Sequence, residues 1–204
     1  MPAMIVARRR QLRSGTRGVV PRGFTLIELM VAILVLGILL GVAVPSFREA
    51  ALSSRLTGYA NDLVASAQLA RSEAIKRNAA VTLCASKNGT TCGIDAGSGW
   101  EAGWIVLAPA RDIEVTTDDV DDEDGFEMVT LPAEVLQRQP PLSTEFRMRA
   151  GAVTSISFPP TIVGVTPATF KVCRASPVGK QERLVAITAS GSTSVKTDDE
   201  EVCP

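Results

Sequence analysis

Hydrophobic and polar positions change character along this chain, beginning with a long uncharged run. Residues 29–47 carry no charge and are nearly all apolar, and they follow a single acid, Glu28. At ~1.5 Å per residue a helix of this length measures about 28 Å, which is enough to cross the hydrocarbon core of a bilayer. The pattern therefore predicts a membrane-length helix over residues 24–47.

Beyond Pro45 the apolar residues recur at three- and four-residue spacing, which is typical of an amphipathic helix. Charged residues fall largely between them. We expect residues 48–78 to form a helix that packs one stripe against a globular domain. The stripe consists of Leu52, Leu56, Tyr59, Leu63, Ala67, Ala70 and Ala74.

After residue 80 the pattern changes to short apolar runs separated by Gly, Pro and Asn, which indicates antiparallel strands. One long helix followed by sheet predicts an α+β fold, with residues 80–204 rich in β-structure. The expected strands are Val81–Ala85, Trp104–Leu107, Phe126–Leu131, Ser155–Phe158, Thr169–Cys173, Leu184–Ala189 and Ser192–Lys196.

Composition narrows the possible chemistry. The 204 residues include no histidine, which excludes a His-based catalytic triad, a His-ligated metal and a His general base. All four cysteines follow the apolar segment, so we expect disulfides formed in an oxidising compartment. The Asn88-Gly89 turn signal between Cys84 and Cys92 favours the pairs Cys84–Cys92 and Cys173–Cys203. The alternative is a zinc site, which the absence of Cys-x-x-Cys and of histidine disfavours.

Charge divides the chain into a basic head and an acidic body. Residues 1–23 contain six arginines and no acid, whereas residues 24–204 carry a net charge of −7. Because positive flanks stay cytoplasmic, we expect the N-terminus inside and residues 48–204 exported. An acidic body does not favour nucleic acid as a partner.

Two simple interpretations of the apolar run leave the presence of Glu28 unexplained. Gly41–Ala43 resembles a signal-peptide cleavage site, and a plain single-span anchor is the other simple interpretation. A charged side chain in the bilayer costs about 2.5–3.5 kcal/mol and is usually paired. If the chain is cut between Gly23 and Phe24, the new α-amine lies one helical turn from Glu28. Such a pair, within one chain or between neighbours, would set the register between packed helices.

The stretch GFTLIELMVAILVLGILLGVAVPSF resembles the N-terminal signature of type IV pilins and type II secretion pseudopilins. The resemblance implies a cytoplasmic leader, residues 1–23, that a prepilin peptidase removes between Gly23 and Phe24, with N-methylation of Phe24. It also implies an assembly role for Glu28 and a bent or loosened helix at Pro45. The leader is longer than that of many family members, although the cleavage residues are intact.

A second resemblance covers the later part of the chain. QLARSEAIKRNAAVTLCAS, GTTCG and GWEAGWIVL are similar to the GspH/FimT family, which includes minor pilins and a secretion pseudopilin. ISFPPTIVGVTPATFKVCRA and RLVAITASGS match the late strands of that family more loosely. For Trp100 and Trp104 we expect packing in the core or at its rim rather than ligand binding.

Two further stretches carry possible chemistry. In the acid-rich run over residues 118–124, Asp124 stands where an EF-hand needs glycine and Thr130 where it needs glutamate. A calcium site of another kind stays an open alternative to a solvated loop, while a glycosidase carboxylate pair is rejected because no apolar frame spaces it. Asn88-Gly89-Thr90 fits a glycosylation sequon, but a tight turn explains it better.

DNA binding needs separate treatment because some FimT-like minor pilins bind DNA through a basic segment near the C-terminus. Here Ser192 and Ser194 follow Gly191 where arginines would help, and four acids follow at residues 198–201. Phosphate contacts need cationic side chains, so the sequence does not favour DNA binding.

The sequence as a whole predicts a structural subunit without catalytic activity, metal or cofactor. We expect a minor pilin that acts in priming or tip assembly of a type IV pilus, for twitching motility and adhesion. Its expected partners are other minor and major pilins, the prepilin peptidase and the inner membrane. It would first be a single-pass inner-membrane protein with a periplasmic C-terminal domain, and then enter a pilus or pseudopilus. The alternatives are a GspH-like type II secretion pseudopilin and a DNA-binding pilin for transformation.

Overall fold

The fold is taken from a computed structural model, which describes residues 23–116, 126–161, 164–175, 182–198 and 203. The chain divides into two units, Met1–Ser46 and Phe47–Pro204. One helix, α1 (Leu26–Arg77), supplies the described helical part of the first unit and the first element of the second. The division between the units falls one residue after Pro45, whose backbone is helical.

In the first unit, α1 is apolar on every face, and none of its described side chains is buried. Every side chain that the structure describes between residues 23 and 46 is exposed. The helix is long and apolar enough to cross a membrane. A helix that is hydrophobic all round needs lipid or other helices around it, so this unit requires surroundings that the single chain does not supply.

In the second unit, α1 presents a face of small residues to the sheets. Trp104 of the second strand reaches this face, where its indole Nε1 donates to Ser66 Oγ over 2.9 Å. Ser66 in turn donates to the carbonyl oxygen of Asp62 over 2.8 Å, so this buried hydroxyl is satisfied on both sides. The predicted stripe is confirmed, with Leu52 and Tyr59 partly buried at its margin. The buried residues of this face are Leu56, Ala60, Leu63, Ser66, Ala67, Ala70 and Ala74, of which Ala60 and Ser66 were not in the predicted stripe.

The C-terminus of α1 is closed by a left-handed residue, Asn78, with φ of 48°. The N–H of Ala79 donates to the carbonyl of Ala74 over 3.2 Å, and that of Asn78 donates to Ile75 over 3.3 Å. These two bonds form a Schellman motif, which satisfies carbonyls that the helix end would otherwise leave unpaired. The chain therefore turns sharply from the helix into the first strand.

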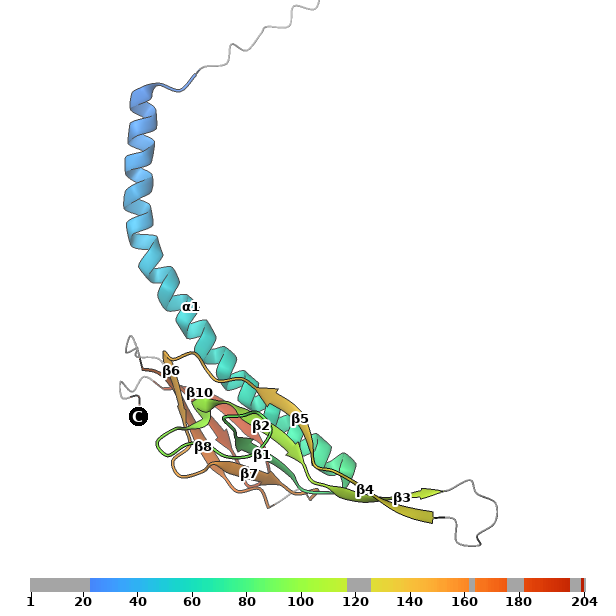
Figure 1. Cartoon of the computed structure of the whole chain (residues 1–204). Coiled ribbons are helices and arrows are strands. Elements are labelled where there is room, and N and C mark those ends of the chain that lie inside the picture. Colours follow the sequence, from blue (N-terminus) through green and yellow to red (C-terminus); the bar gives the residue numbers. More distant parts are fainter. Residues whose placement is uncertain (1–22, 117–125, 162–163, 176–181, 199–202, 204) are drawn as a thin grey trace, which may run out of the picture. The chain divides into compact units, whose positions relative to one another are not determined.

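The described residues form ten strands and a short 3₁₀ helix, η1 (Trp100–Ala102). Two antiparallel four-stranded sheets have the orders β5-β2-β1-β7 and β10-β9-β8-β6, and β3 pairs only with β4. Strands of both sheets lie along the globular part of α1, while the β3–β4 hairpin projects away from them (Figure 1). The strands are β1 (Val81–Ala85), β2 (Trp104–Ala108), β3 (Arg111–Thr116), β4 (Phe126–Leu131), β5 (Glu134–Gln139), β6 (Phe146–Arg149), β7 (Ser155–Phe158), β8 (Ala168–Arg174), β9 (Glu182–Ile187) and β10 (Thr193–Asp198).

Both sheets and the helix contribute to one hydrophobic core. Trp100 packs edge-on against Phe170, with ring centroids 4.8 Å apart, and donates its indole N–H to the carbonyl of Val153 over 2.7 Å. Trp100 and Trp104 are both buried. Their expected packing role is confirmed, and the alternative of ligand binding by these rings is not supported.

All seven predicted strands are present with small shifts at their ends, but β3, β5 and β6 were missed. β5 and β6 lie at the edges of their sheets, and β3 lies in the two-stranded hairpin. Edge strands carry charged and polar side chains that interrupt apolar runs. In β6, for example, Phe146 and Met148 are buried while Arg147 and Arg149 alternate with them.

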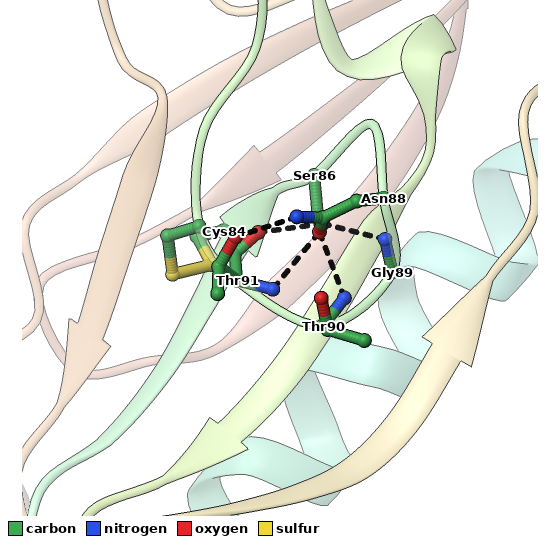
Figure 2. Close-up of a disulfide and its surroundings, with 7 residues drawn as sticks. Cys84, Ser86, Asn88, Gly89, Thr90 and Thr91 are labelled. Carbon is green, nitrogen blue, oxygen red and sulfur yellow. Dashed lines mark hydrogen bonds between the residues drawn. A yellow bond between two sulfur atoms is a disulfide. The ribbon is translucent and has the colours of Figure 1, made fainter.

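The structure contains two disulfides, Cys84–Cys92 and Cys173–Cys203, each with Cα atoms 5.5 Å apart. These are the pairs that the sequence favours. The first closes a tight loop after β1, shown in Figure 2. The second ties β8 to the C-terminal segment. With all four cysteines bonded, a cysteine zinc site is not formed.

The alanine face generates a stability prediction. Ala67 is buried against the sheets, whereas Ala65 of the same helical turn is exposed. Ala67→Leu should lower the free energy of unfolding by about 1–3 kcal/mol, because added methylenes overpack a filled core. Ala65→Leu is the matched control and should change it by less than about 0.5 kcal/mol. Chemical denaturation measures both, and equal effects would contradict this packing.

The last helical turn carries charges that generate a pH prediction. Glu73 accepts from Lys76 and from Arg77, and Arg77 also pairs with Glu134 of β5 at 2.9 Å. The hydrogen bonds from Lys76 and Arg77 lower the pKa of Glu73 below its ordinary 4.5. A lowered carboxyl pKa stabilises the fold above the unfolded value, and this stabilisation is lost as pH falls through the folded value.

Glu73→Gln should therefore lower the free energy of unfolding at neutral pH by less than about 1 kcal/mol, since its partners are partly exposed. The difference from wild type should vanish once the pH falls below the lowered folded-state pKa of Glu73, because Glu73 is then protonated in both states. Burial raises the pKa of Asp62, so its contribution to the pH dependence of stability has the opposite sign. That contribution is the same in both proteins, so it cancels when the variant is compared with wild type. A difference independent of pH would contradict the assignment.

Candidate functional site

The N-terminal end of α1 is closed by a reciprocal pair of hydrogen bonds between Thr25 and Glu28. The backbone N–H of Glu28 donates to Thr25 Oγ1 over 3.3 Å, and the backbone N–H of Thr25 donates to Glu28 Oε2 over 3.5 Å. This arrangement is a capping box, which satisfies N–H groups that the helix start leaves without partners. In the uncleaved chain, Glu28 thus already has a local role.

The sequence contained the signal for this cap, because Thr25 precedes Glu28 by three residues at the start of an apolar run. The sequence-based prediction paired Glu28 only with the new α-amine, so this cap was missed. The acid also lies in the first turn of α1, where the helix dipole favours negative charge.

The residues around the predicted cleavage point lie together and open to solvent. A surface depression of about 440 Å³ is lined by Gly23, Phe24, Thr25 and Glu28. Phe24 is 86% exposed. No heavy atom lies within 4 Å of the position a Cβ of Gly23 would occupy. Nothing in the described chain therefore demands glycine at position 23 on steric grounds.

Along the globular part of α1, the face opposite the core carries an uncharged row that we call the exposed stripe. Its members alternate at four- and three-residue spacing, so they form one continuous seam on the helix surface. No heavy atom lies within 4 Å of a Cβ built at Gly58 in the middle of this row. The exposed stripe consists of Phe47, Ala51, Ser54, Gly58, Asn61, Ala65, Gln68, Ser72 and Ile75.

Polar contacts tie β8 and β9 to the first globular turns of α1. The largely buried guanidinium of Arg174 donates to both carboxylate oxygens of Glu49, at 3.1 and 3.4 Å. Arg183 donates to Thr57 Oγ1 at 3.2 Å and to Ser53 Oγ at 3.3 Å. These bonds fix the rotation of the helix about its own axis relative to the sheet.

The turn between β9 and β10 contains Gly191, which begins the segment where the DNA-binding alternative needs basic residues. Gly191 has φ of 73°, and its N–H donates to the carbonyl of Thr188 over 2.8 Å. Arg71 of α1 donates to the carbonyl of Ser190, so this nearby cation holds the turn. The hydroxyls of Thr188, Ser190 and Ser192 bond to one another. The arrangement explains the glycine by turn geometry and does not favour DNA binding.

The remaining sequence expectations concern metal binding, the acid-rich run and Pro45. The acid-rich run at residues 118–124 lies outside the described residues, as does the side chain of Pro45. Within the described part of the chain, no group of three or more His, Cys, Asp or Glu residues could hold a metal ion.

Comparison with known proteins identifies two segments. The family described as Type II transport protein GspH matches residues 59–191, and the Prokaryotic N-terminal methylation motif matches residues 21–44. No curated protein matches the chain. The GspH match covers residues 59–77 of α1 and the strands through β9, while the methylation motif covers the capping box and the apolar part of the helix as far as residue 44.

Two crystal structures of the type IV minor pilin FimU from Pseudomonas aeruginosa PAO1 are similar to this chain. One has 19% identity and a TM-score of 0.45, and covers 69% of this chain and 92% of FimU. The other has 20% identity and a TM-score of 0.47, with 70% and 89% covered. Because both scores are low, the family assignment depends on the family matches instead. The chain belongs to the GspH family and carries the prokaryotic N-terminal methylation motif at the start of its helix.

Proposed function

We propose that this protein is a minor pilin of a type IV pilus, a structural subunit that acts in priming or tip assembly. The observation that carries the proposal is that one chain contains both the methylation motif, at residues 21–44, and the GspH region, at residues 59–191. The subunits of this family are structural proteins rather than enzymes. The exposed, wholly apolar first part of α1 supports the proposal, because such a surface requires lipid or neighbouring helices.

The chain is first inserted with its arginine-rich leader, residues 1–23, in the cytoplasm. A prepilin peptidase then cuts between Gly23 and Phe24 and methylates the new amine of Phe24. The open surroundings of Gly23 support this step, because the fold sets no steric demand for glycine there. The two disulfides fit export of residues 48–204 to the periplasm.

Cleavage changes the partners available to Glu28. Before it, the carboxylate caps α1 through the N–H of Thr25. Afterwards, the α-amine of Phe24 lies within a helical turn of Glu28 and carries a positive charge that the peptide lacked. In apolar surroundings a charge pair is stronger and more directional than in water, so Glu28 sets the axial register, pairing with this amine or with that of a neighbouring subunit.

The exposed stripe supplies the second contact surface with other minor and major pilins. Small residues such as Ala51, Gly58 and Ala65 let helix backbones approach closely, and Asn61 and Gln68 can hydrogen-bond across the contact. No stripe residue carries a charge that would have to be desolvated. The stripe lies opposite the core face, so packing it against a neighbour leaves the globular fold unchanged.

A second candidate is a minor pseudopilin of a type II secretion system, favoured by the description of the matching GspH family. The same helix contacts would serve either machine. A strain that lacks this protein separates them, because lost twitching supports the pilus and lost export of secreted proteins supports secretion. We expect reduced twitching with normal export. The opposite result would overturn the pilus assignment but leave the subunit role intact.

The dual role of Glu28 predicts how three variants differ. Glu28→Gln keeps a capping-box residue but loses the charge, so the helix should start normally while incorporation into fibres falls sharply. Glu28→Ala should lose both functions. Thr25→Val weakens the cap by about 1 kcal/mol yet keeps the carboxylate, so incorporation should be largely retained.

Membrane fractionation and quantification of the protein in sheared fibres measure insertion and incorporation separately. All three variants should insert like wild type, because the apolar run is unchanged. Wild-type incorporation of Glu28→Gln would show that capping, and not charge pairing, is what Glu28 contributes.

A further inference from the structure

The loop closed by Cys84–Cys92 contains the chemically most labile dipeptide of the chain. Of the three asparagines, Asn61, Asn78 and Asn88, only Asn88 is followed by glycine. Deamidation of asparagine begins with attack by the backbone nitrogen of the next residue on the side-chain carbonyl carbon. Glycine in that next position offers the least steric hindrance, since it has no Cβ. Asn88 is also exposed to water.

The hydrogen bonds of this loop polarise the carboxamide of Asn88. Its Oδ1 accepts from the N–H of Thr90 at 2.9 Å and from the N–H of Thr91 at 3.0 Å. Two backbone N–H groups on one carbonyl oxygen stabilise the negative charge that develops there when a nucleophile attacks the carbon. These two hydrogen bonds therefore make Cγ of Asn88 a better electrophile, which favours deamidation (Figure 2).

The loop opposes deamidation by holding the nucleophile, the backbone nitrogen of Gly89, in place. The N–H of Gly89 donates to Ser86 Oγ at 3.0 Å, and Ser86 is buried and donates to the carbonyl of Thr91 at 2.6 Å. Gly89 is itself buried, and the side chain of Arg138 in β5 lies 2.6 Å from where a Cβ of Gly89 would be. To attack, the nitrogen of Gly89 must leave Ser86 and lose its proton. The disulfide and Arg138 restrict the backbone movement that this requires.

We propose that Asn88 is a latent deamidation site, primed by the N–H groups of Thr90 and Thr91 and held unreactive by the bond between Gly89 and Ser86 within the disulfide-closed loop. Opening the loop releases the Gly89 nitrogen. Deamidation then places a negative charge, and in the isoaspartate product an extra backbone carbon, in a turn that borders β1 and β5. The inference does not depend on which fibre the protein enters.

The reaction needs only water and hydroxide. Hydroxide removes the proton from the Gly89 nitrogen, which bonds to Cγ of Asn88. The bond from Cγ to Nδ2 breaks, and Nδ2 takes a proton from water and leaves as ammonia. Water then opens the resulting succinimide at either carbonyl carbon to give aspartate or isoaspartate. No electrons are transferred, and the rate rises with pH because the attacking nitrogen must be deprotonated.

The test follows residue 88 of the full chain in detergent by peptide mass spectrometry during incubation in mildly alkaline buffer. Ser86→Ala should deamidate at least about fivefold faster than wild type, because the N–H of Gly89 loses its acceptor. The double variant Cys84→Ser, Cys92→Ser should also be faster. Ser72→Ala, which changes an exposed serine elsewhere, is the matched control and should match wild type, and Asn61 and Asn78 serve as internal references.

A second measurement on unaltered protein guards against a variant that fails to fold. Hydrogen exchange at the Gly89 amide of wild type should be slow, because its N–H is buried and bonded. Exchange at the rate of an exposed amide would overturn the proposal. So would a Ser86→Ala variant that deamidates at the wild-type rate, or a native wild type that deamidates as fast as the urea-unfolded chain.

Discussion

The close contact between the alanine face of α1 and the two sheets is the interaction on which the rest of the structure depends. Ala60, Ala67, Ala70 and Ala74 are all buried and present only a methyl group, so strands of both sheets can approach the helix backbone. Trp104 packs against this alanine face, and its indole N–H donates a hydrogen bond to Ser66 Oγ. A larger residue on this face would push the sheets outward and open the core on both sides of the helix.

The same contact determines which face of α1 remains available to other molecules. A helix has one orientation about its axis once a stripe is buried, and Arg174 and Arg183 hold that orientation at the first globular turns. The exposed stripe is what is left on the opposite side. Folding of the globular unit and presentation of an uncharged contact seam are thus two results of one packing arrangement. A helix rotated by one residue would bury polar side chains and expose alanines.

The lone acid in the apolar segment has a satisfied position even before any neighbour arrives. Thr25 and Glu28 close the helix start, which lowers the cost of keeping a carboxylate beside an apolar helix. In the function we propose, cleavage after Gly23 supplies a charged amine that competes with the Thr25 N–H for the same carboxylate. Because one group serves both arrangements, the helix start can exchange a local bond for an intermolecular one without leaving the acid unpaired.

Sequence patterns alone determined the elements whose side chains alternate strongly. The apolar run, the amphipathic stripe through Leu63 and Ala70, and strands such as β7 and β8 were predicted because burial of one face demands hydrophobic periodicity. The cap at Thr25 was also readable, though we missed it. Only the tertiary structure decided the rest. Edge strands such as β6 carry charged residues on their solvent-facing side, and these residues break up the apolar runs by which strands are predicted from sequence. The contact of Arg138 with Gly89 joins β5 to the loop after β1, and no local pattern encodes a contact that exists only once the sheet has formed.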